Sequence, residues 1–395
     1  MKIKQAQKNI PYGWPQKKLG DVCQINMGQS PSSIAYNEIG NGLPLIQGNN
    51  DMKRGITVER IWTSETTKVA EKGSIILTVR APVGVVGVAH NKICIGRGVC
   101  SINSANRGFI FHFLKYYESK WLSLEQGSTF TAVNSSDIRS LKLDLPPLPE
   151  QNRIVLVLET WDKAIEKLAK KIEVKKNIKK GLMQRLLTGE LRLPGFSEAW
   201  QVVKLGEVGE IVTGNTPPMK ELENYNGSYC WATAEDFNSK YIFNTAVKLT
   251  EQGKSKSRFL PAGSILVTCI ASIGKNALAG VPLATNQQIN AVVVNDKNDK
   301  EFIYYLIENS KKLLINSAGA GAMPILNKSE FSRLKIKIPK IKKEQTTISN
   351  ILVTADKEIE SLEQKLKVLK EQKKYLLNNL ITGAIRTPET MKINA

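Results

Sequence analysis

Arginine, asparagine and glutamine side chains occupy several stretches that are expected to form loops, and these residue types suit the reading of DNA base edges. In the major groove, arginine pairs in a bidentate way with guanine, and asparagine or glutamine does so with adenine. The candidates are Asn49, Asn50, Arg80 and Arg97 in the first half and Lys275, Asn286, Gln287 and Gln288 in the second, with Thr129 and Asn134 as weaker candidates. Arg97 is favoured, because Gly96 and Gly98 allow close backbone approach. Singly, such residues more often serve turn geometry, so the group is the stronger prediction.

Signatures of catalysis are absent from the sequence. It contains no Gly-x-x-x-x-Gly-Lys-Ser/Thr phosphate loop, no Gly-x-Ser-x-Gly nucleophile motif and no Gly-x-Gly-x-x-Gly dinucleotide motif. The Asn-Pro-Pro-aromatic motif of amino-methyltransferases is also missing. Five cysteines without a close pair, with only two histidines, cannot form the usual zinc spacings. The pair Glu235-Asp236 could accept from cytosine or act in acid–base chemistry, but no matching carboxylates recur in the other half. We expect no catalytic site, metal or cofactor on this chain.

The composition points to a polyanionic partner. The formal net charge is +20 over 395 residues, and the pI is about 9.6. Lysine and arginine near phosphates release condensed counterions, so nucleic acid is the favoured partner. The sequence shows neither an apolar run long enough to span a membrane nor the apolar core of a signal peptide at its N-terminus. We therefore expect a cytoplasmic protein that binds double-stranded DNA and no membrane.

The chain repeats itself after roughly 190 residues. Lys17-Lys18-Leu19-Gly20-Asp21-Val22 is answered by Val203-Lys204-Leu205-Gly206-Glu207-Val208. Gly73 and Gly263 each open an apolar stretch that predicts a buried strand. Each half closes with a long helical pattern and a similar tail, Leu187-Thr188-Gly189-Glu190-Leu191 in one and Ile381-Thr382-Gly383-Ala384-Ile385 in the other. Two similar modules on one chain suit a target that also has two halves.

Two heptad stripes predict long helices over residues 150–187 and 344–381. Prolines precede both stretches, and Gly189 and Gly383 stand where a helix stop is expected. Each helix would run about 38 residues, or roughly 57 Å, too long to pack on a single module. The stripes are therefore expected to pair with each other, and short connections favour an antiparallel pair. The pairing residues are Ile154, Leu158, Trp161, Ile165, Leu168 and Ile172 in the first stripe and Ile348, Leu352, Ile359, Leu362, Leu366 and Leu369 in the second.

Lysines interrupt the two stripes at matched positions, Lys179 and Lys373. A polar residue at such a position commonly fixes the register of a coiled coil, which is the favoured interpretation. The alternative is that these lysines, with Lys175, Lys176 and Lys180, face a phosphate backbone. Trp14 and Trp200 also occupy matched positions and are expected in the core or between module and coil, rather than stacked on bases.

The expected fold is α/β, with two similar mixed α/β domains joined by two long antiparallel coiled-coil helices in a pseudo-two-fold, nearly circular arrangement. Expected strands in each module are followed by a helix, about 109–124 in the first and 301–315 in the second, then by a glycine-rich loop. The expected boundaries are 1–148 for the first domain, 149–188 for the central helix, 189–199 for a connector, 200–338 for the second domain, 339–387 for the distal helix and 388–395 for a tail.

This organisation resembles the specificity subunits of type I restriction-modification systems over essentially the whole chain. The most specific element is Leu145-Pro146-Pro147-Leu148-Pro149-Glu150-Gln151, which leads into the first long helix. Its second copy, Ile338-Pro339-Lys340-Ile341-Lys342-Lys343-Glu344-Gln345, departs from the pattern but keeps the Glu-Gln pair. The resemblance implies two target recognition domains, each reading half of a bipartite DNA site, and helices that set a fixed gap.

The resemblance also implies partners. Two methyltransferase subunits would dock on the helices, and restriction subunits would join in a restricting system. S-adenosylmethionine, ATP and Mg would then belong to those partner chains, and the chain itself would be a non-enzymatic subunit. Two other hypotheses remain: a DNA-binding coiled-coil scaffold without methylase partners, or an orphaned specificity subunit; and an enzyme, such as a nuclease, whose carboxylate cluster is not visible in the sequence. The recognised bases, the gap length and the choice between restriction and methylation alone lie beyond the sequence.

Overall fold

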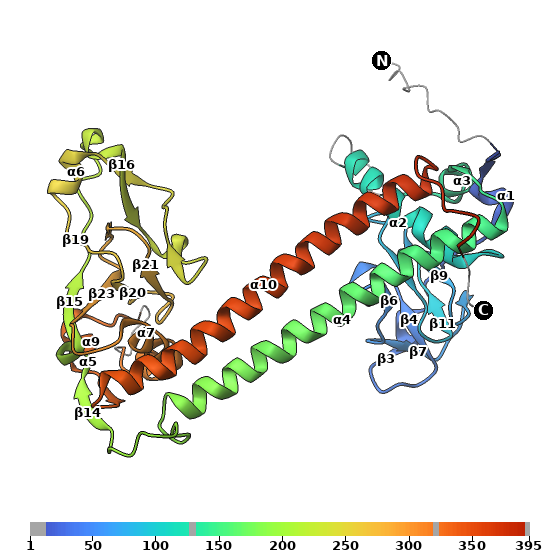
Figure 1. Ribbon diagram of the computed structural model, residues 1–395. Helices are drawn as coiled ribbons and strands as arrows, with labels where there is room; N and C mark the ends of the chain where they lie inside the picture. Colours follow the sequence, from blue (N-terminus) through green and yellow to red (C-terminus); the bar gives the residue numbers. More distant parts are fainter. Residues whose placement is uncertain (1–12, 126–131, 319–323, 392–395) are drawn as a thin grey trace. The chain divides into compact units, whose positions relative to one another are not determined.

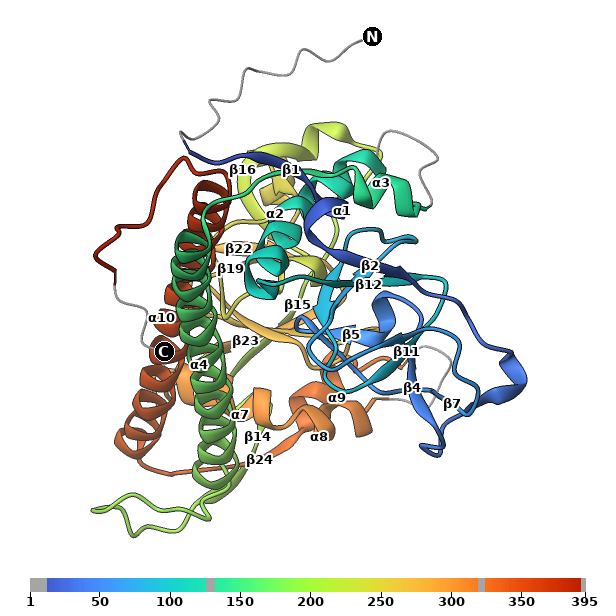
Figure 2. The ribbon, with the colours of Figure 1, turned by 90° about the vertical axis from the view of Figure 1, so that its right-hand side faces the viewer.

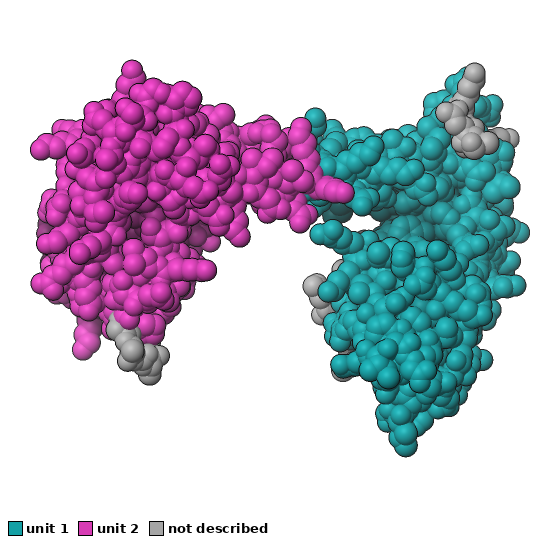
Figure 3. All heavy atoms as spheres, turned by 90° about the horizontal axis from the view of Figure 1, so that it is seen from below, with its two compact units in different colours: residues 1–169, 365–395 teal, residues 170–364 magenta. Residues whose placement is uncertain are grey.

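The computed structural model describes residues 13–125, 132–318 and 324–391 (Figure 1). The chain forms two compact units (Figure 3). The first unit contains residues 1–169 and 365–395, and the second contains residues 170–364. Each long helix is therefore divided near its middle between the two units, whereas the expected boundaries treated each helix as a separate segment.

Two sheets and a strand pair form the first unit. The larger sheet has the order β2-β12-β9-β10-β6-β5, the smaller has the order β3-β7-β4-β11-β8, and β1 pairs with β13. The strands are β1 Gln16–Lys18, β2 Gln24–Met27, β3 Tyr36–Asn37, β4 Leu43–Ile46, β5 Met52–Lys53, β6 Ile56–Thr57, β7 Trp62–Thr63, β8 Val69–Ala70, β9 Ile75–Thr78, β10 Val86–Val88, β11 Ile93–Ile95, β12 Val99–Asn103 and β13 Lys142–Asp144. The helices are α1 Leu19–Val22, α2 Arg107–Glu125 and α3 Ser135–Arg139, with short 3-10 turns η1 Ser33–Ala35 and η2 Asn49–Asp51.

The second unit repeats this plan. One sheet has the order β15-β23-β20-β21-β17, another the order β18-β16-β22-β19, and β14 pairs with β24. The strands are β14 Gln201–Lys204, β15 Gly209–Thr213, β16 Tyr225–Ala232, β17 Tyr241–Ile242, β18 Lys248–Leu249, β19 Phe259–Leu260, β20 Ile265–Thr268, β21 Asn276–Ala279, β22 Leu283–Thr285, β23 Ile289–Val294 and β24 Lys335–Ile338. The helices are α5 Leu205–Val208, α6 Glu251–Ser255, α7 Lys300–Asn309, α8 Lys311–Asn316 and α9 Lys328–Arg333, with 3-10 turns η3 Leu222–Asn224 and η4 Ala234–Asp236.

The central strand of each unit is formed by the apolar stretch that follows Gly73 or Gly263 in the sequence repeat. All four residues of β9 and all four of β20 are buried, since each strand has neighbours on both sides. β9 lies antiparallel between β10 and β12, and β20 lies antiparallel between β21 and β23. Continuous apolar strands of this kind fit a sheet that is covered on both faces. The expected mixed α/β repeat is confirmed.

The two long helices are α4 Leu148–Leu186 and α10 Lys342–Ile381, of 39 and 40 residues. Within each unit the α4 and α10 segments lie side by side (Figures 1 and 2). Ile154 and Leu158 join the core of the first unit together with Leu380, and Ile348 and Leu352 join that of the second. The start of one helix thus lies beside the end of the other, which is an antiparallel pairing in each unit.

Both long helices end as the sequence predicts. Gly189 and Gly383 follow the two helices with φ of +76° and +69°, the left-handed conformation that glycine adopts without a steric penalty. The twelve predicted pairing residues are all buried or half-buried. Leucine and isoleucine at heptad spacing therefore fall on one continuous face of each helix.

The prediction of one helix over 301–315 was wrong, because α7 and α8 are separate helices that meet at Ser310. The Ser310 N–H donates to both Leu306 O and Ile307 O, which ends the α-helical ladder at this residue. The glycine-rich loops predicted around residues 127–129 and 319–321 lie outside the described residues.

Candidate nucleic-acid interface

Four loops of the first unit lie against one another at the ends of the sheet strands. We call residues 28–30, 47–50, 79–84 and 96–98 the first loop cluster. The Val79 N–H donates to Gly98 O at 2.9 Å, and the Arg97 N–H donates to Ser30 Oγ at 3.1 Å. A Cβ added at Gly98 would lie 2.0 Å from Gln47 O, so the 47–50 loop touches the 96–98 loop. The structure thus brings the segments of Arg80, Arg97, Asn49 and Asn50 together.

The side chains of these four candidates are all exposed, whereas the backbone beneath them is held by hydrogen bonds. The buried Asp51 carboxylate accepts the backbone N–H groups of Gln47 and Gly48 at 2.8 and 3.2 Å. Asn49 and Asn50 belong to the short η2 turn that this carboxylate closes. Gly98 is required by the close approach of the Gln47 backbone oxygen, and a Cβ at Gly96 would lie 3.0 Å from the Gln47 side chain, so these glycines face neighbouring protein atoms rather than a ligand. The result is a fixed loop surface that presents polar side chains.

The second unit contains the equivalent second loop cluster, residues 214–216, 232–236, 269–275 and 286–288. The Cys269 N–H donates to Gln288 O at 2.8 Å, and the Asn286 N–H donates to Ala232 O at 3.1 Å. Thr216 Oγ1 donates to Gln287 Oε1 at 2.5 Å, in the place where Ser30 contacts Arg97 in the first unit. Lys275 and Gln287 are exposed, and Gln288 is half-buried.

Matched loop positions in the two clusters carry different chemistry. Arg97 corresponds to Gln287, because each follows the strand that the repeat places there and each contacts the equivalent hydroxyl. Arg80 corresponds to Ile270, since Arg80 forms an isolated bridge to Ala132 and Ile270 forms one to Ile325. The backbone arrangement is the same in the two loop clusters, whereas the exposed side chains differ.

Some candidates have structural roles. Asn286 Oδ1 accepts the Gln288 N–H at 3.1 Å, and Asn134 Oδ1 accepts the Asp137 N–H at 3.0 Å as the N-cap of α3. These contacts are the turn and cap roles typical of asparagine. Thr129 lies outside the described residues.

The acidic pair Glu235-Asp236 divides into two roles. Asp236 Oδ2 accepts the Thr233 N–H at 2.8 Å and closes η4, as Asp51 closes η2 in the first unit. Glu235 is exposed on that turn and occupies the place of Asn50. Glu235 is therefore a further candidate contact residue, which comparison of the two halves around these aspartates could have found.

A triad of buried Trp14, buried Glu150 and exposed Arg386 fastens the start of the first domain to the helix pair. Glu150, at the start of α4, accepts a hydrogen bond from Trp14 Nε1 at 3.1 Å and two from Arg386 at 2.6 Å each. The Arg386 guanidinium also stacks over the Trp14 ring at 5.2 Å. Burial alone would raise the pKa of Glu150, but the hydrogen bonds from Arg386 and Trp14 outweigh it and hold the pKa below its ordinary value.

The second unit contains the same triad from different parts of the chain. Glu344 accepts from Trp200 Nε1 at 3.1 Å and from Arg192 at 3.0 and 3.3 Å, and Arg192 lies 5.8 Å from the Trp200 ring. Arg192 follows α4, whereas Arg386 follows α10. The first unit is thus completed by the far end of the chain. Trp14 and Trp200 join domain to coil, as expected.

The lysines that interrupt the heptad stripes form ion pairs between the two helices. Lys373 contacts Asp162 at 2.5 Å in the first unit, and Lys179 contacts Asp356 at 2.6 Å in the second. Lys175 and Lys176 also pair across the helices, with Glu358 at 2.7 Å and Glu363 at 2.6 Å. These contacts favour the register interpretation over direct phosphate contact for Lys373, Lys179, Lys175 and Lys176. Lys180 is exposed and forms no ion pair among the described residues, so the phosphate alternative stays open for it.

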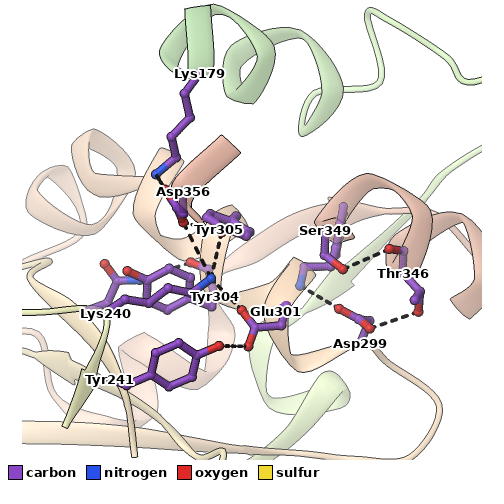
Figure 4. A network of polar contacts seen from close by, with 12 residues as sticks. Lys179, Lys240, Tyr241, Asp299, Glu301, Tyr304, Tyr305, Thr346, Ser349 and Asp356 are labelled. Atoms are coloured by element: carbon purple, nitrogen blue, oxygen red, sulfur yellow. Dashed lines mark hydrogen bonds and ion pairs between the residues drawn. The ribbon is translucent and has the colours of Figure 1, made fainter. Parts of the chain in front are cut away.

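In the second unit, this ion pair extends into the domain (Figure 4). The Tyr305 hydroxyl of α7 donates to Asp356, and Lys240 Nζ donates to the Tyr305 hydroxyl at 2.7 Å. Lys240 also pairs with Glu301 at 2.8 Å, to which the Tyr241 hydroxyl donates. Burial, together with the neighbouring carboxylates, raises the pKa of Tyr305 well above its ordinary range. The network therefore fastens α7 and β17 to the helix pair.

His112 of α2 lies near the corresponding ion pair of the first unit. Its imidazole is buried, and burial, followed by the charge of Lys373, lowers its pKa to about 4, while Asp162 acts in the opposite direction. His112 is therefore neutral near pH 7. The two units thus share the ion pair between helices but differ in the side chain that faces it.

Residues 13–125, 132–318 and 324–391 contain no cluster of three or more His, Cys, Asp or Glu side chains that could hold a metal ion. The five cysteines are buried and free, and burial raises the pKa of Cys23 and Cys100 to about 12. None of the described helices is long and apolar enough to cross a membrane.

Comparison with known proteins gives matches along both halves. The family model described as type I restriction modification DNA specificity domain matches residues 11–176 and 197–371. The MjaVIII specificity subunit of Methanocaldococcus jannaschii is 25% identical over 95% of this chain and 94% of its own length. The putative MjaX specificity subunit of the same organism is 38% identical, but the match covers 47% of this chain and 45% of that protein. A crystal structure of a type I restriction-modification S subunit from M. genitalium has a TM-score of 0.60 at 18% identity, covering 96% of this chain and 99% of that one.

Proposed function

Because the chain belongs to the family of type I restriction modification DNA specificity domains, we propose that it reads a bipartite DNA target, with one half-site contacted by each loop cluster and a fixed gap between them. The proposal is supported by one observation above others. The two clusters are held by equivalent backbone hydrogen bonds, Val79 N–H to Gly98 O and Cys269 N–H to Gln288 O. They nevertheless present different side chains, Arg97 in one and Gln287 in the other. Readers of this kind would recognise two different short sequences.

The base contacts proposed for the first half-site come from Arg80, Arg97, Asn49 and Asn50. Arginine at two positions favours guanine in that half, because the guanidinium matches O6 and N7 of guanine. In the second cluster, Gln287 and Gln288 favour adenine, and Glu235 suits the amino group of cytosine. Lys275, exposed on the β20–β21 hairpin, suits either a guanine edge or a phosphate.

We further propose that two methyltransferase subunits dock on α4 and α10, and that restriction subunits join them in a restricting complex. Exposed lysine and glutamate side chains cover the outward faces of these helices and would contact the partners. S-adenosylmethionine, ATP and Mg would be bound by the partner chains. The protein would then act in the cytoplasm as a non-catalytic subunit that selects the site of adenine methylation or cleavage.

The test is co-expression with a methyltransferase subunit of the same system, followed by single-molecule sequencing of methylated adenines in host DNA. One split motif with two specific halves around a constant gap is expected, and it should vanish when the gene for this chain is deleted. Random or absent methylation by a complex that assembles would contradict the proposal. Absent methylation with no assembly, from a chain that still binds DNA, would favour a DNA-binding scaffold or an orphaned subunit.

A further inference from the structure

The second unit contains a groove of about 730 Å³ beside its loop cluster. The groove lies where α4, α10 and the junction of α7 with α8 come together, and its lining includes Lys180, Lys311 and Lys312. All three of these lysines are exposed. A groove with several exposed lysines suits a polyanion.

Pairing within the groove leaves three lysines and one carboxyl group, so the remaining charge is positive. Lys176 and Lys179, which also line it, are neutralised by Glu363 and Asp356 at 2.6 Å each. Within the described part of the chain, Lys180, Lys311 and Lys312 have no ion-pair partner at 4.0 Å or less. The remaining acid, Glu308, has a pKa that burial raises above its ordinary value, and the three unpaired lysines outnumber it in either protonation state.

The groove is continuous with the second loop cluster. A Cβ added at Gly274 would lie 3.0 Å from Lys311 Cγ, so the β20–β21 turn lies directly against the start of α8. Lys275, the next residue, is exposed on that turn. Lys275, Lys311, Lys312 and Lys180 therefore form a basic strip from the candidate reading loop to α4.

The corresponding place in the first unit is built differently among its described residues. Its domain helix α2 continues without a break where α7 gives way to α8, and Glu118 on α2 pairs with Lys115 at 3.1 Å. Gly84, the counterpart of Gly274, faces the Trp121 side chain instead of a lysine. The break at Ser310 thus places Lys311 and Lys312 beside the groove of the second unit.

We propose that the basic strip binds the DNA phosphate backbone that adjoins the second half-site, which makes the second domain the electrostatic anchor on DNA. This inference rests on the proposed function. The strip contributes affinity without sequence information, because lysine contacts a phosphate as a point charge. Each phosphate neutralised should contribute about 0.9 to the slope of log affinity against log salt.

The experiment compares the full-length protein with the double variant Lys311→Gln/Lys312→Gln. Binding is measured from 0.05 to 0.5 M salt on a duplex containing the methylated motif and on a scrambled duplex. The salt slope should fall by about 1.8, and affinity near 0.15 M salt should fall roughly 30-fold on both duplexes. The motif itself should be unchanged.

The matched control is Lys335→Gln/Lys337→Gln, which removes the same charge from exposed positions on β24 that do not line the groove. An unchanged thermal midpoint shows that both variants are folded. The inference is overturned if the groove variant and the control variant change the salt slope equally, or if neither changes it. It is also overturned if the groove variant keeps its DNA affinity but no longer binds the methyltransferase subunit. That result would mean that the groove binds an acidic protein surface. If the unaltered protein shows no preference for the motif duplex, the proposed function fails and this inference falls with it.

Discussion

At the scale of single residues, each loop cluster contains two kinds of side chain: some hydrogen-bond to the backbone of the loops, and others are exposed. Asp51 and Asp236 close equivalent turns with equivalent hydrogen bonds, so they cannot account for a difference between the two readers. The exposed neighbours Asn50 and Glu235 differ. Substitutions at exposed positions should therefore change recognition without changing the fold.

Replacing Arg97 with alanine should weaken recognition in one half-site only. A bidentate pair between arginine and guanine contributes about 1–3 kcal/mol to discrimination, so relaxed selection at one base is expected. Gln287→Ala should relax one base in the other half. Methylome sequencing of each variant checks both results. Relaxation in both half-sites from a single substitution would argue against independent readers.

His112 should make the first unit less stable as the pH falls. Its pKa is about 4 in the folded protein against an ordinary value of 6.5, because burial and Lys373 disfavour the charged form. Its contribution is therefore complete above pH 6.5 and is lost as the pH falls toward 4, by up to about 3 kcal/mol. Urea unfolding at pH 7 and pH 5 should show a smaller difference for His112→Gln than for the unaltered protein. Equal differences in the two proteins would assign the pH dependence to other groups.

At the scale of elements, the helix pair combines an apolar seam with one matched ion pair in each unit. Lys373 and Lys179 pair with Asp162 and Asp356 at equivalent positions. A charged pair at a half-buried site contributes less to stability than apolar packing does, but it opposes alternative registers. The main role of these ion pairs is therefore to fix the register of the two helices.

Reversing one charge should test this role. Lys373→Glu places a second carboxylate beside that of Asp162 and should destabilise the first unit by about 1 kcal/mol. Adding Asp162→Lys to the same chain should restore most of that loss. Unfolding measurements on both single variants and the double variant form a double-mutant cycle. Strictly additive effects would show that the two groups do not interact.

The sequence predicted the elements that depend on local pattern. Heptad spacing and terminal glycines gave both long helices almost to the residue, and the repeat located β9 and β20. It missed the break at Ser310, because an apolar helical pattern runs through that residue and nothing local marks the stop. It also could not show that Gly96 and Gly98 fit against Gln47, or that Lys311 lies beside Gly274, since both contacts join distant segments.

At the scale of the whole molecule, the proposed gap in the DNA target depends on the length of the helices. An α-helix rises 1.5 Å per residue, and B-DNA rises about 3.4 Å per base pair. Four residues inserted at the end of α4, before Thr188, should therefore change the gap by at most about two base pairs. Both half-site sequences should stay the same in the methylome. A changed half-site with a constant gap would contradict the idea that the helices act as a ruler.

The Trp–Glu–Arg triads have a consequence for how genes of this kind can recombine. In the first unit, Trp14 and Glu150 come from the front of the gene and Arg386 from its back, while Arg192 supplies the same contact in the second unit. Recombination within α4 could therefore join the front of one such gene to the back of a relative, and the matching arginine would still meet its glutamate. A bacterial or archaeal lineage could acquire a new target by exchanging half a gene, with no need to evolve a new fastening.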